Sequence, residues 1–366
     1  MPKYHDLQGL LAEGVTQGVY TAAVALVGLK GELRWQGAAG RLSRAPQAPA
    51  ATLATVFDLA SFTKPLATAL ALLRLLAQGQ LTLDTALGEV LRRDWLPPDK
   101  RPLTLLSLLT HRTGLPAWRP FYQKILAASP EDRPGLLARL AAAEPLGAPG
   151  ETLYSDLGFM LLQAVVEEVA GEDLDSFCRR EIYRPLSLPT LGFNPLKQPG
   201  GEALAFAATE MGLIPDRPIY GEVHDENAWA AGGVAGHAGF FGPGREVFTL
   251  LGALYAAYHG ARTIFPPDLA QLFLTPAPGG SRTPGFDTPA ANSAPAAGRY
   301  FSPASVGHLG FTGVSFWLDL RLGQMVVLLT NRVHLGRDDK AKIQAFRPRF
   351  HEAASRALGF TREYRT

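Results

Sequence analysis

Two residues with complementary chemistry, Ser61 and Lys64, stand three positions apart in the stretch DLASFTKPLATALALLRLLAQG, residues 58–79. On a helix, residues at this spacing share a face, so the hydroxyl and the amine would lie side by side. An ammonium at the positive end of a helix and in apolar surroundings is disfavoured, which predicts a lowered pKa for Lys64. Such an amine is a suitable general base for a serine nucleophile. The alternative is that Ser61 only caps the helix.

A buried helix has to position this pair. Residues 66–78 are apolar on nearly every face, and Gly79 supplies a helix stop. Proline is tolerated only in the first turn of a helix, so Pro65 places the helix start close to Ser61. A backbone amide at that start is able to donate a hydrogen bond to an oxyanion. The helix therefore predicts a site at its N-terminal end.

Two further segments carry polar groups in positions that fit the same chemistry. ETLYSDLGF places Tyr154 directly before a predicted helix that is capped by Ser155 or Asp156. SVGHLGFTG places His308-Leu309-Gly310 on a predicted strand near the C-terminus. Together with Ser61-Phe62-Thr63-Lys64, this ordered set resembles the three motifs of the serine β-lactamase and penicillin-binding-protein superfamily. The class C-like members, which include esterases, D-peptidases and penicillin-binding protein 4B-like proteins, are the most similar in pattern.

The resemblance implies a role for each residue. Ser61 would be the acylated nucleophile, Lys64 its base, and Tyr154 a relay that moves protons between them and the leaving group. The backbone amides of Ser61 and Phe311 would form the oxyanion hole. Gly310 would let a substrate backbone lie close to the strand, where a Cβ atom would intrude. The implied reaction is acyl transfer through a covalent acyl-enzyme, followed by hydrolysis.

The chain departs from the family pattern at two motifs. The usual Tyr-x-Asn is Tyr-Ser-Asp here, and an ionised Asp156 that reached Lys64 would raise the lysine pKa and oppose its role as a base. Tyr154 would then carry more of the proton transfer; the alternative for Asp156 is a plain helix cap. The usual Lys-Thr-Gly is His-Leu-Gly, so a fixed cation becomes His308, mostly neutral at pH 7, and a hydroxyl becomes Leu309. These changes predict a less positive pocket, a neutral ester or amide substrate, and poor β-lactam turnover.

Four histidines, His111, His224, His237 and His308, are candidate metal ligands by residue type. No His-Glu-x-x-His pattern or close histidine pair is present, so no metal and no cofactor is expected. GGVAGHAGFFG lacks the Gly-Lys-Ser/Thr ending of a phosphate cradle, and we expect it to line the pocket floor with His237 hydrogen-bonded in place. We expect His111 to satisfy carbonyls at a helix C-terminus. Arg332, after the last strand, is expected to lie on the surface; the alternative is that it anchors an acid group. HDEN, residues 224–227, is either a solvated turn or a pocket rim.

The remaining elements predict an α+β fold. Strands are expected at 21–28 and 33–40 and in three segments between 305 and 332, with helices over 4–17 and 338–358. Close strands with tight turns favour an antiparallel sheet of about five strands, built from both chain ends and flanked by helices. The expected division is residues 1–62 and 304–366 for this sheet domain and 63–303 for a mainly helical region with pocket loops, as in β-lactamases and transpeptidases.

Composition limits the classes of function. The 366 residues are 47% hydrophobic and 19% charged with a net charge of +2, so nothing global predicts a nucleic-acid or membrane partner. The one cysteine, Cys178, excludes an intrachain disulfide and is expected to be packed in the core. No apolar run approaches a membrane span and the N-terminus lacks a signal-peptide pattern, so we expect a cytoplasmic monomer. Residues 274–303 are expected to form a long loop, either a pocket rim or disordered.

The sequence thus predicts a serine hydrolase that acts through an acyl-enzyme on a small ester or amide, most simply an esterase or peptidase. One alternative is a true β-lactamase or D-Ala-D-Ala carboxypeptidase that takes a β-lactam-like substrate. Another is a ligand-binding scaffold without catalysis. The substitutions at Asp156 and His308 keep this last alternative open.

Overall fold

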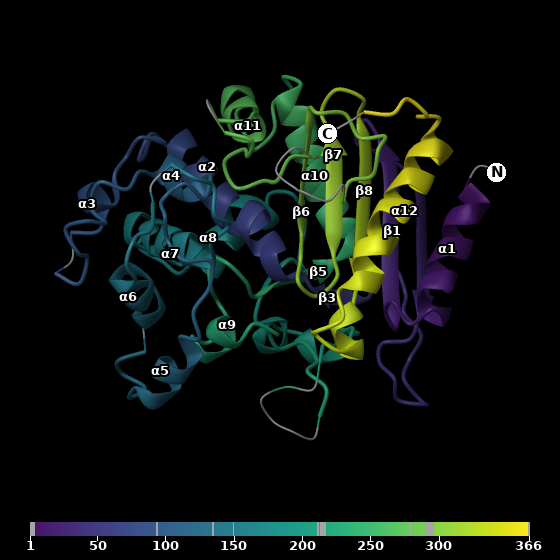
Figure 1. Cartoon of the computed structure of the whole chain (residues 1–366), viewed down its shortest axis with the longest axis horizontal. Helices are drawn as coiled ribbons and strands as arrows, with labels where there is room; N and C mark the ends of the chain where they lie inside the picture. The colour runs from purple at the N-terminus through teal and green to yellow at the C-terminus, as the bar shows by residue number, and fades with distance from the viewer. Residues whose placement is uncertain are drawn as a thin grey trace.

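A five-stranded antiparallel sheet forms the centre of the protein, with strand order β2-β1-β8-β7-β6 (Figure 1). The computed structural model describes residues 4–92, 94–133, 135–148, 150–210, 212, 217–277, 280–289 and 296–364. The strands are β1 (Ala22–Leu29), β2 (Glu32–Gly40), β6 (Ser305–Leu309), β7 (Ser315–Asp319) and β8 (Gln324–Thr330). Both chain ends contribute to this sheet, which confirms the predicted fold class.

The central strands are buried because helices cover both faces of the sheet. All seven residues of β8 and the first seven of β1 are buried, so neither strand shows an alternating pattern of exposure. Helices α1 (His5–Thr16) and α12 (Ala341–Leu358) pack on one face, and α10 (Gly244–Tyr258) packs on the other (Figure 1). The two-residue turn between β1 and β2 has positive φ at Lys30 and Gly31, as a tight hairpin requires.

A mainly helical region lies beside the β6 edge of the sheet (Figure 1). Its helices are α2 (Leu70–Ala77), α3 (Leu87–Val90), α4 (Leu105–Leu109), α5 (Tyr122–Ala127), α6 (Leu136–Ala143), α7 (Asp156–Ala170), α8 (Leu174–Cys178), α9 (Glu226–Ala230) and α11 (Pro267–Leu274). A small sheet, β3 (Val56–Asp58), β5 (Phe240–Pro243) and β4 (Gly192–Phe193), has the order β3-β5-β4.

Cys178 is buried as predicted, and burial raises the pKa of its thiol. The predicted domain division at residues 62 and 304 is untested and stays a prediction.

The helix that was predicted to begin near Ser61 does begin there, but its first turns are irregular. A 3₁₀ turn at Ala60–Phe62 leads into a π-helical segment at Lys64–Ala69 before α2 begins. Single π turns inside helices are frequently found at functional sites. One 18-residue window, Ala60–Ala77, would suffice for a membrane span by length and composition, although 78% of it is buried inside the protein. The expectation that no apolar run approaches a span was therefore wrong, although a core helix has the same composition.

Candidate active site

The amine of Lys64 lies against the hydroxyl of Ser61. Lys64 Nζ is 3.1 Å from Ser61 Oγ, as the spacing of three residues predicted. The lysine side chain is fully buried, and Nζ also donates to the backbone oxygen of His237 at 3.1 Å. Its third partner is Asp156, whose Oδ1 lies 2.7 Å away. The Ser61 hydroxyl and the Lys64 amine are therefore close enough for acyl-transfer chemistry. Lys64 Nζ is held by three oxygen atoms, those of Ser61, His237 and Asp156.

The structure contradicts the prediction of a lowered lysine pKa. Burial alone would lower the pKa of Lys64, but the Asp156 carboxylate and the Tyr154 phenol beside it together raise the pKa above its usual range. Asp156 is the first residue of α7, and the side chain of Ser155, at the N-cap position, makes no capping hydrogen bond. Asp156 is therefore not a simple helix cap: it holds Lys64 as an ammonium, the case considered from the sequence.

Tyr154 completes the group from a distant segment of the chain. The centre of its ring is 4.9 Å from Lys64 Nζ, and it lines two pockets that both include Ser61. Histidine rings lie on either side of it: the ring centres of His111 and His308 are 4.6 Å and 6.0 Å from that of Tyr154. The structure thus brings together the serine, the lysine and the tyrosine that the sequence singled out.

The third motif lies on β6, the edge strand beside the Ser61 turn. His308 is buried, and its Nδ1 donates to the backbone oxygen of Leu309 at 2.8 Å. Burial lowers the pKa of His308 well below its usual range, and the charges of Lys64 and Arg282 add to this effect. The imidazole is therefore neutral, as predicted. Because Nδ1 carries the proton, Nε2 is an acceptor, and it has no hydrogen-bond partner among the residues that the structure describes.

Gly310 is required by packing within the protein. A Cβ atom at this position would lie 2.3 Å from Val314 Cγ2 and 3.0 Å from the backbone oxygen of Leu59. Any larger residue would push β6 away from the segment that carries Ser61. The family resemblance implied a second reason for glycine at position 310, which is that a substrate backbone lies close to the strand. This second reason stays a prediction.

The backbone amides of Ser61 and Phe311 are both available as oxyanion donors. Within the described part of the chain, neither amide donates to a backbone or side-chain acceptor. The Phe311 peptide is fixed by Arg332, whose Nε and Nη2 donate to its oxygen at 3.1 Å and 2.8 Å. Arg332 is only 4% exposed, so the prediction of a surface arginine was wrong. A long side chain after a strand gave no sequence signal for this buried role.

A basic pocket lies on one side of Ser61. It is lined by Ser61, Tyr154, His308, Leu309, Gly310 and Phe311 and by four cationic side chains, Arg282, Arg332, Lys340 and Arg347, with Asp287 as the carboxylate. Arg282 pairs with Asp287, and Arg347 donates to the backbone oxygens of Gly310 and Val314 at 2.9 Å and 2.8 Å. These cations come from segments outside the three motifs, whereas the prediction of a less positive pocket concerned the motif residues alone; as a comparison with the family it stays a prediction. Arg282 and Asp287 also confirm that part of the 274–303 segment is a pocket rim.

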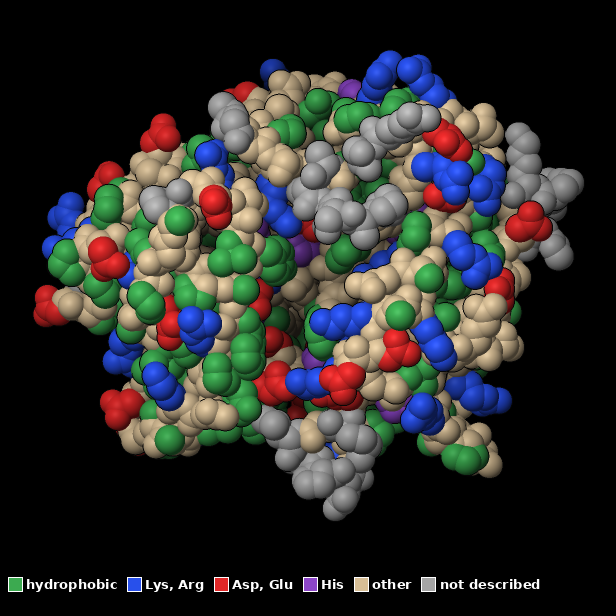
Figure 2. Space-filling view, viewed as in Figure 1, with side chains coloured by type: hydrophobic (Ala, Val, Ile, Leu, Met, Phe, Trp, Pro, Cys, Tyr) green, Lys and Arg blue, Asp and Glu red, His purple; other side chains and the backbone are tan. Residues whose placement is uncertain are grey.

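An acidic pocket lies on the other side of Ser61. It is lined by the carboxylates of Asp58, Asp156, Asp225 and Glu226, with Arg337 among them, and by Trp118, Tyr154, His224, His237 and Phe311. His237 Nε2 lies 3.0 Å from Asp225 Oδ1, which confirms a histidine held in place at the pocket. HDEN is therefore a pocket rim. The space-filling view in Figure 2 shows a hollow in the middle of the molecular surface. Histidine is visible inside the hollow, and lysine or arginine side chains lie along the side of the hollow nearer the five-stranded sheet.

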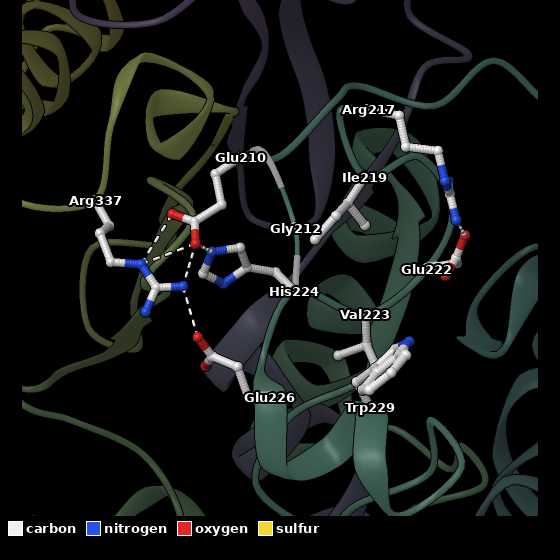
Figure 3. Close-up of a pocket in the computed structure, with 10 residues that line it drawn as sticks. All are labelled: Glu210, Gly212, Arg217, Ile219, Glu222, Val223, His224, Glu226, Trp229 and Arg337. Atoms are coloured by element: carbon white, nitrogen blue, oxygen red, sulfur yellow. Dashed lines mark hydrogen bonds and ion pairs between the residues drawn. The ribbon is translucent and has the colours of Figure 1, made fainter. Parts of the chain in front are cut away.

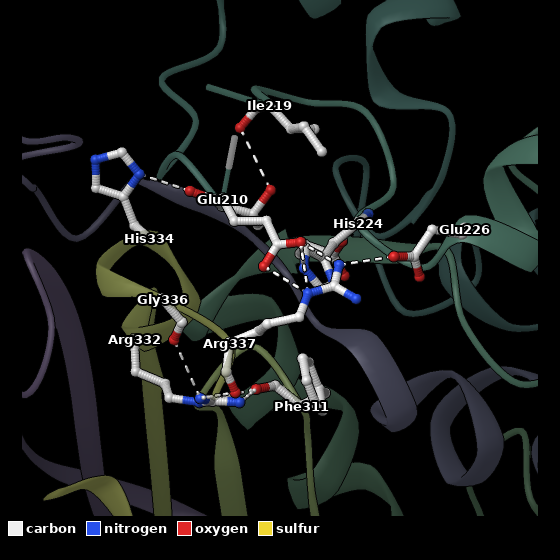
Figure 4. Close-up of polar contacts among 11 residues, drawn as sticks. Glu210, Ile219, His224, Glu226, Phe311, Arg332, His334, Gly336 and Arg337 are labelled. Carbon is white, nitrogen blue, oxygen red and sulfur yellow. Dashed lines mark hydrogen bonds and ion pairs between the residues drawn. The ribbon is translucent and has the colours of Figure 1, made fainter. Parts of the chain in front are cut away.

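A charged bridge separates the acidic pocket from a neighbouring cavity. Arg337 Nε donates to Glu210 at 2.8 Å and its Nη2 donates to Glu226 at 2.7 Å. His224, Glu226 and Arg337 line both spaces, and Trp229 closes the far wall of the second one (Figure 3). Figure 4 shows that Arg332 and Arg337 diverge, the first toward the Phe311 peptide and the second toward the two glutamates.

Two further predictions about histidines concern metal binding and the end of α4. Among the residues described, no group of three or more His, Cys, Asp or Glu side chains is placed to hold a metal ion. His111 directly follows the C-cap of α4, as predicted, and its backbone amide donates to the Leu108 carbonyl at 3.1 Å; its side chain bonds none of the helix carbonyls that the structure describes. Its Nδ1 instead accepts a hydrogen bond from the Ser155 amide at 3.0 Å.

Comparisons with known proteins agree with this geometry. The Beta-lactamase family model matches residues 7–347. A putative D-alanyl-D-alanine carboxypeptidase of Escherichia coli K12 is 32% identical over 311 residues, which cover 78% of this chain and 70% of the relative. An N-acetylmuramyl-L-alanine amidase of Bacillus subtilis 168 is 33% identical over 308 residues, 76% of this chain and 68% of the relative.

Solved structures share the fold at lower identity. A penicillin-binding protein homologue from Caulobacter crescentus superimposes with a TM-score of 0.73 at 19% identity, over 98% of both chains. EstCE1, a hydrolase with promiscuous acyltransferase activity, gives a TM-score of 0.69 at 22% identity, over 94% of this chain and 98% of the other. These likenesses confirm the predicted fold.

Proposed function

Because this chain belongs to the β-lactamase family of serine hydrolases, we propose that it cleaves a small amide substrate whose leaving group carries a free carboxylate, as a carboxypeptidase does. The observation that supports this choice is the basic pocket beside Ser61, where Arg282, Arg332, Lys340 and Arg347 outnumber Asp287. Guanidinium and ammonium groups are the usual partners of a carboxylate. The names of two relatives, a carboxypeptidase and an amidase, are consistent with amide substrates.

In the proposed reaction, Ser61 Oγ attacks the scissile carbonyl while its proton passes to Tyr154. Tyr154 takes this part as a phenolate: Asp156 holds Lys64 as an ammonium, and this ammonium stabilises the phenolate until the Ser61 proton neutralises it. The Ser61 and Phe311 amides stabilise the oxyanion. The C–N bond breaks, the leaving amine takes the proton from Tyr154, and water hydrolyses the acyl-enzyme with the same proton route in reverse.

Hydrolysis of a neutral ester is a second candidate. Trp118 and Phe311 are 43% and 39% exposed, and both line the acidic pocket. Two exposed aromatic side chains beside a nucleophile offer an apolar surface for an acyl chain without any need for charge. This apolar surface beside Ser61 is the observation that favours ester hydrolysis as the second candidate.

The test compares two substrates that differ only in the carboxylate. A peptide ending in D-Ala-D-Ala and the same peptide with a C-terminal carboxamide are assayed beside p-nitrophenyl butyrate. A hydrogen bond to a charged group contributes about 1.5–3 kcal/mol, so kcat/KM should fall by about 10- to 150-fold for the carboxamide. Equal values for both peptides together with faster ester turnover would favour the esterase.

Two controls identify the nucleophile and the β-lactam response. Ser61→Ala must abolish every activity, and activity that survives it would refute the assignment of the nucleophile. Intact-mass measurement after exposure to a fluorescent penicillin distinguishes the remaining alternatives. A long-lived adduct favours a penicillin-binding protein, rapid turnover favours a β-lactamase, and no label or turnover with any acyl donor favours the scaffold.

A further inference from the structure

We propose that His111 is a positioning residue that fixes the orientation of Tyr154 for proton transfer. It lies two residues beyond α4 and is 4% exposed. Its Nδ1 accepts a hydrogen bond from the amide of Ser155, the residue that follows Tyr154. Its ring packs against that of Tyr154, with 4.6 Å between the ring centres and 35° between the ring planes. One side chain therefore holds both the backbone and the ring of the tyrosine.

The backbone around His111 makes the same connection. Residues 111–117 and 153–156 run beside each other and are joined on both sides of Tyr154. The hydrogen bonds are Leu153 N to His111 O at 3.0 Å, Ser155 Oγ to Pro116 O at 2.6 Å, and Asp156 N to Ala117 O at 2.9 Å. Because these bonds flank Tyr154, a shift of His111 would be transmitted directly to the phenol.

A neutral imidazole suits this position. Nδ1 accepts a hydrogen bond from the Ser155 amide, so the single proton of the neutral ring is on Nε2. A second proton on the ring would break the bond to Ser155 and place a charge near Lys64. Burial lowers the pKa of His111 well below its usual range, with further lowering by Arg282 and Lys64. The ring therefore stays neutral and orients the tyrosine without adding charge to the site.

The backbone of His111 is unusual in a way that limits its replacements. Its φ is +58°, in the left-handed region that asparagine tolerates better than most residues other than glycine. Position 111 thus combines a left-handed backbone, an acceptor one bond beyond Cγ, and a planar ring. Asparagine keeps the first two features, because its Oδ1 occupies the place of Nδ1. Glutamine has an acceptor one methylene further out, where it cannot make the same bond.

The experiment measures kcat and KM for p-nitrophenyl butyrate in His111→Asn and His111→Gln, so it does not depend on the proposed peptide substrate. Because a misplacement of about 1 Å can cost about 10²-fold, His111→Gln should lose about 10²-fold in kcat, with KM within about threefold of the wild type. His111→Asn should lose about tenfold at most. Equal losses in the two variants would overturn the proposal.

A double-mutant cycle tests whether His111 acts through Tyr154. In a Tyr154→Phe background, His111→Gln should cause little further loss of kcat, since the phenol that it positions is absent. Fully additive losses would mean that His111 acts independently, and would overturn the proposal. His351→Asn is the matched control: His351, on α12, is also buried, but its Nε2 bonds Ser315 Oγ on β7 rather than a residue next to Tyr154. It should lower the melting temperature without changing kcat.

Discussion

Replacing Asp156 by asparagine should uncover the titration of Lys64 in the pH dependence of catalysis. Lys64 Nζ and Asp156 Oδ1 are 2.7 Å apart, and the lysine side chain is fully buried. At an effective dielectric constant of about 20, two unit charges at this distance attract by about 6 kcal/mol. That value is an upper bound, because the Asp156 side chain is 18% exposed and partly solvated. An opposite charge in contact typically shifts a pKa by about 1–3 units, and we expect a shift of this size.

The direction of the shift follows from the two opposing causes. In the wild type the carboxylate raises the pKa of Lys64, so the ammonium persists through the range in which the enzyme is assayed. In Asp156→Asn the attraction is lost while burial remains, and the pKa of Lys64 falls below its ordinary value of about 10.4. If Tyr154 accepts the Ser61 proton and needs the ammonium beside it, a descending limb in kcat/KM should appear between about pH 8 and 10.

The assay is kcat/KM for p-nitrophenyl butyrate from pH 6 to 10, corrected with Ser61→Ala. Glu226→Gln is the matched control, since Glu226 lines the same pocket and loses the same charge but pairs with Arg337 rather than Lys64. It should show no new limb. Activity of Asp156→Asn that rises with pH across the same range would identify Lys64 as the base and refute the role given to Tyr154. A profile that matches the wild type would show that the ion pair does not control the reaction.

Three further predictions follow from the site and its supports. Gly310→Ala should destabilise the protein by about 1–3 kcal/mol, measured by urea unfolding, because its Cβ atom would meet Val314 and the Leu59 carbonyl. Lys340→Gln should raise KM for the D-Ala-D-Ala peptide while leaving that for p-nitrophenyl butyrate unchanged, since Lys340 lines the basic pocket. Burial lowers the pKa of His351 to about 3, so its unfolded form binds a proton that the folded form excludes. Its contribution to stability is complete above about pH 6.5 and falls by about 1.4 kcal/mol per unit down to the folded pKa, and His351→Asn should flatten that slope in unfolding experiments.

The features predicted correctly from the sequence depend on local spacing and on the order of motifs. Ser61 and Lys64 meet because three residues separate them near a helix start, and Tyr154 meets them because its motif precedes a helix that packs in the same core. The strands were recognisable from short apolar runs separated by glycine turns. The expectations of a cytoplasmic monomer without a membrane or nucleic-acid partner stay predictions.

The features that were missed depend on contacts between distant segments. The sequence left the pKa of Lys64 open between two outcomes: burial and helix position, which are local effects, predict a lowered pKa, and only the fold shows that Asp156, more than ninety positions away, makes the contact that raises it. Arg332 looked like a surface residue because nothing near it in the sequence shows that it reaches back to the Phe311 carbonyl. His111 lies at the end of a helix, as predicted, but only the fold shows that its ring accepts a hydrogen bond from the Ser155 amide.

The distribution of charge around Ser61 accounts for the two departures from the family motifs together. The usual motif lysine would place a cation on β6, where this chain has the neutral His308. Asp156 also neutralises the charge of Lys64, so neither of these positions offers a free cation to a substrate carboxylate. The cations of the basic pocket come instead from the 274–303 segment, the turn after β8, and α12 and the residue before it. In the proposed reaction, the substrate carboxylate would be recognised outside the three motifs, so loss of the motif lysine is compatible with an anionic substrate.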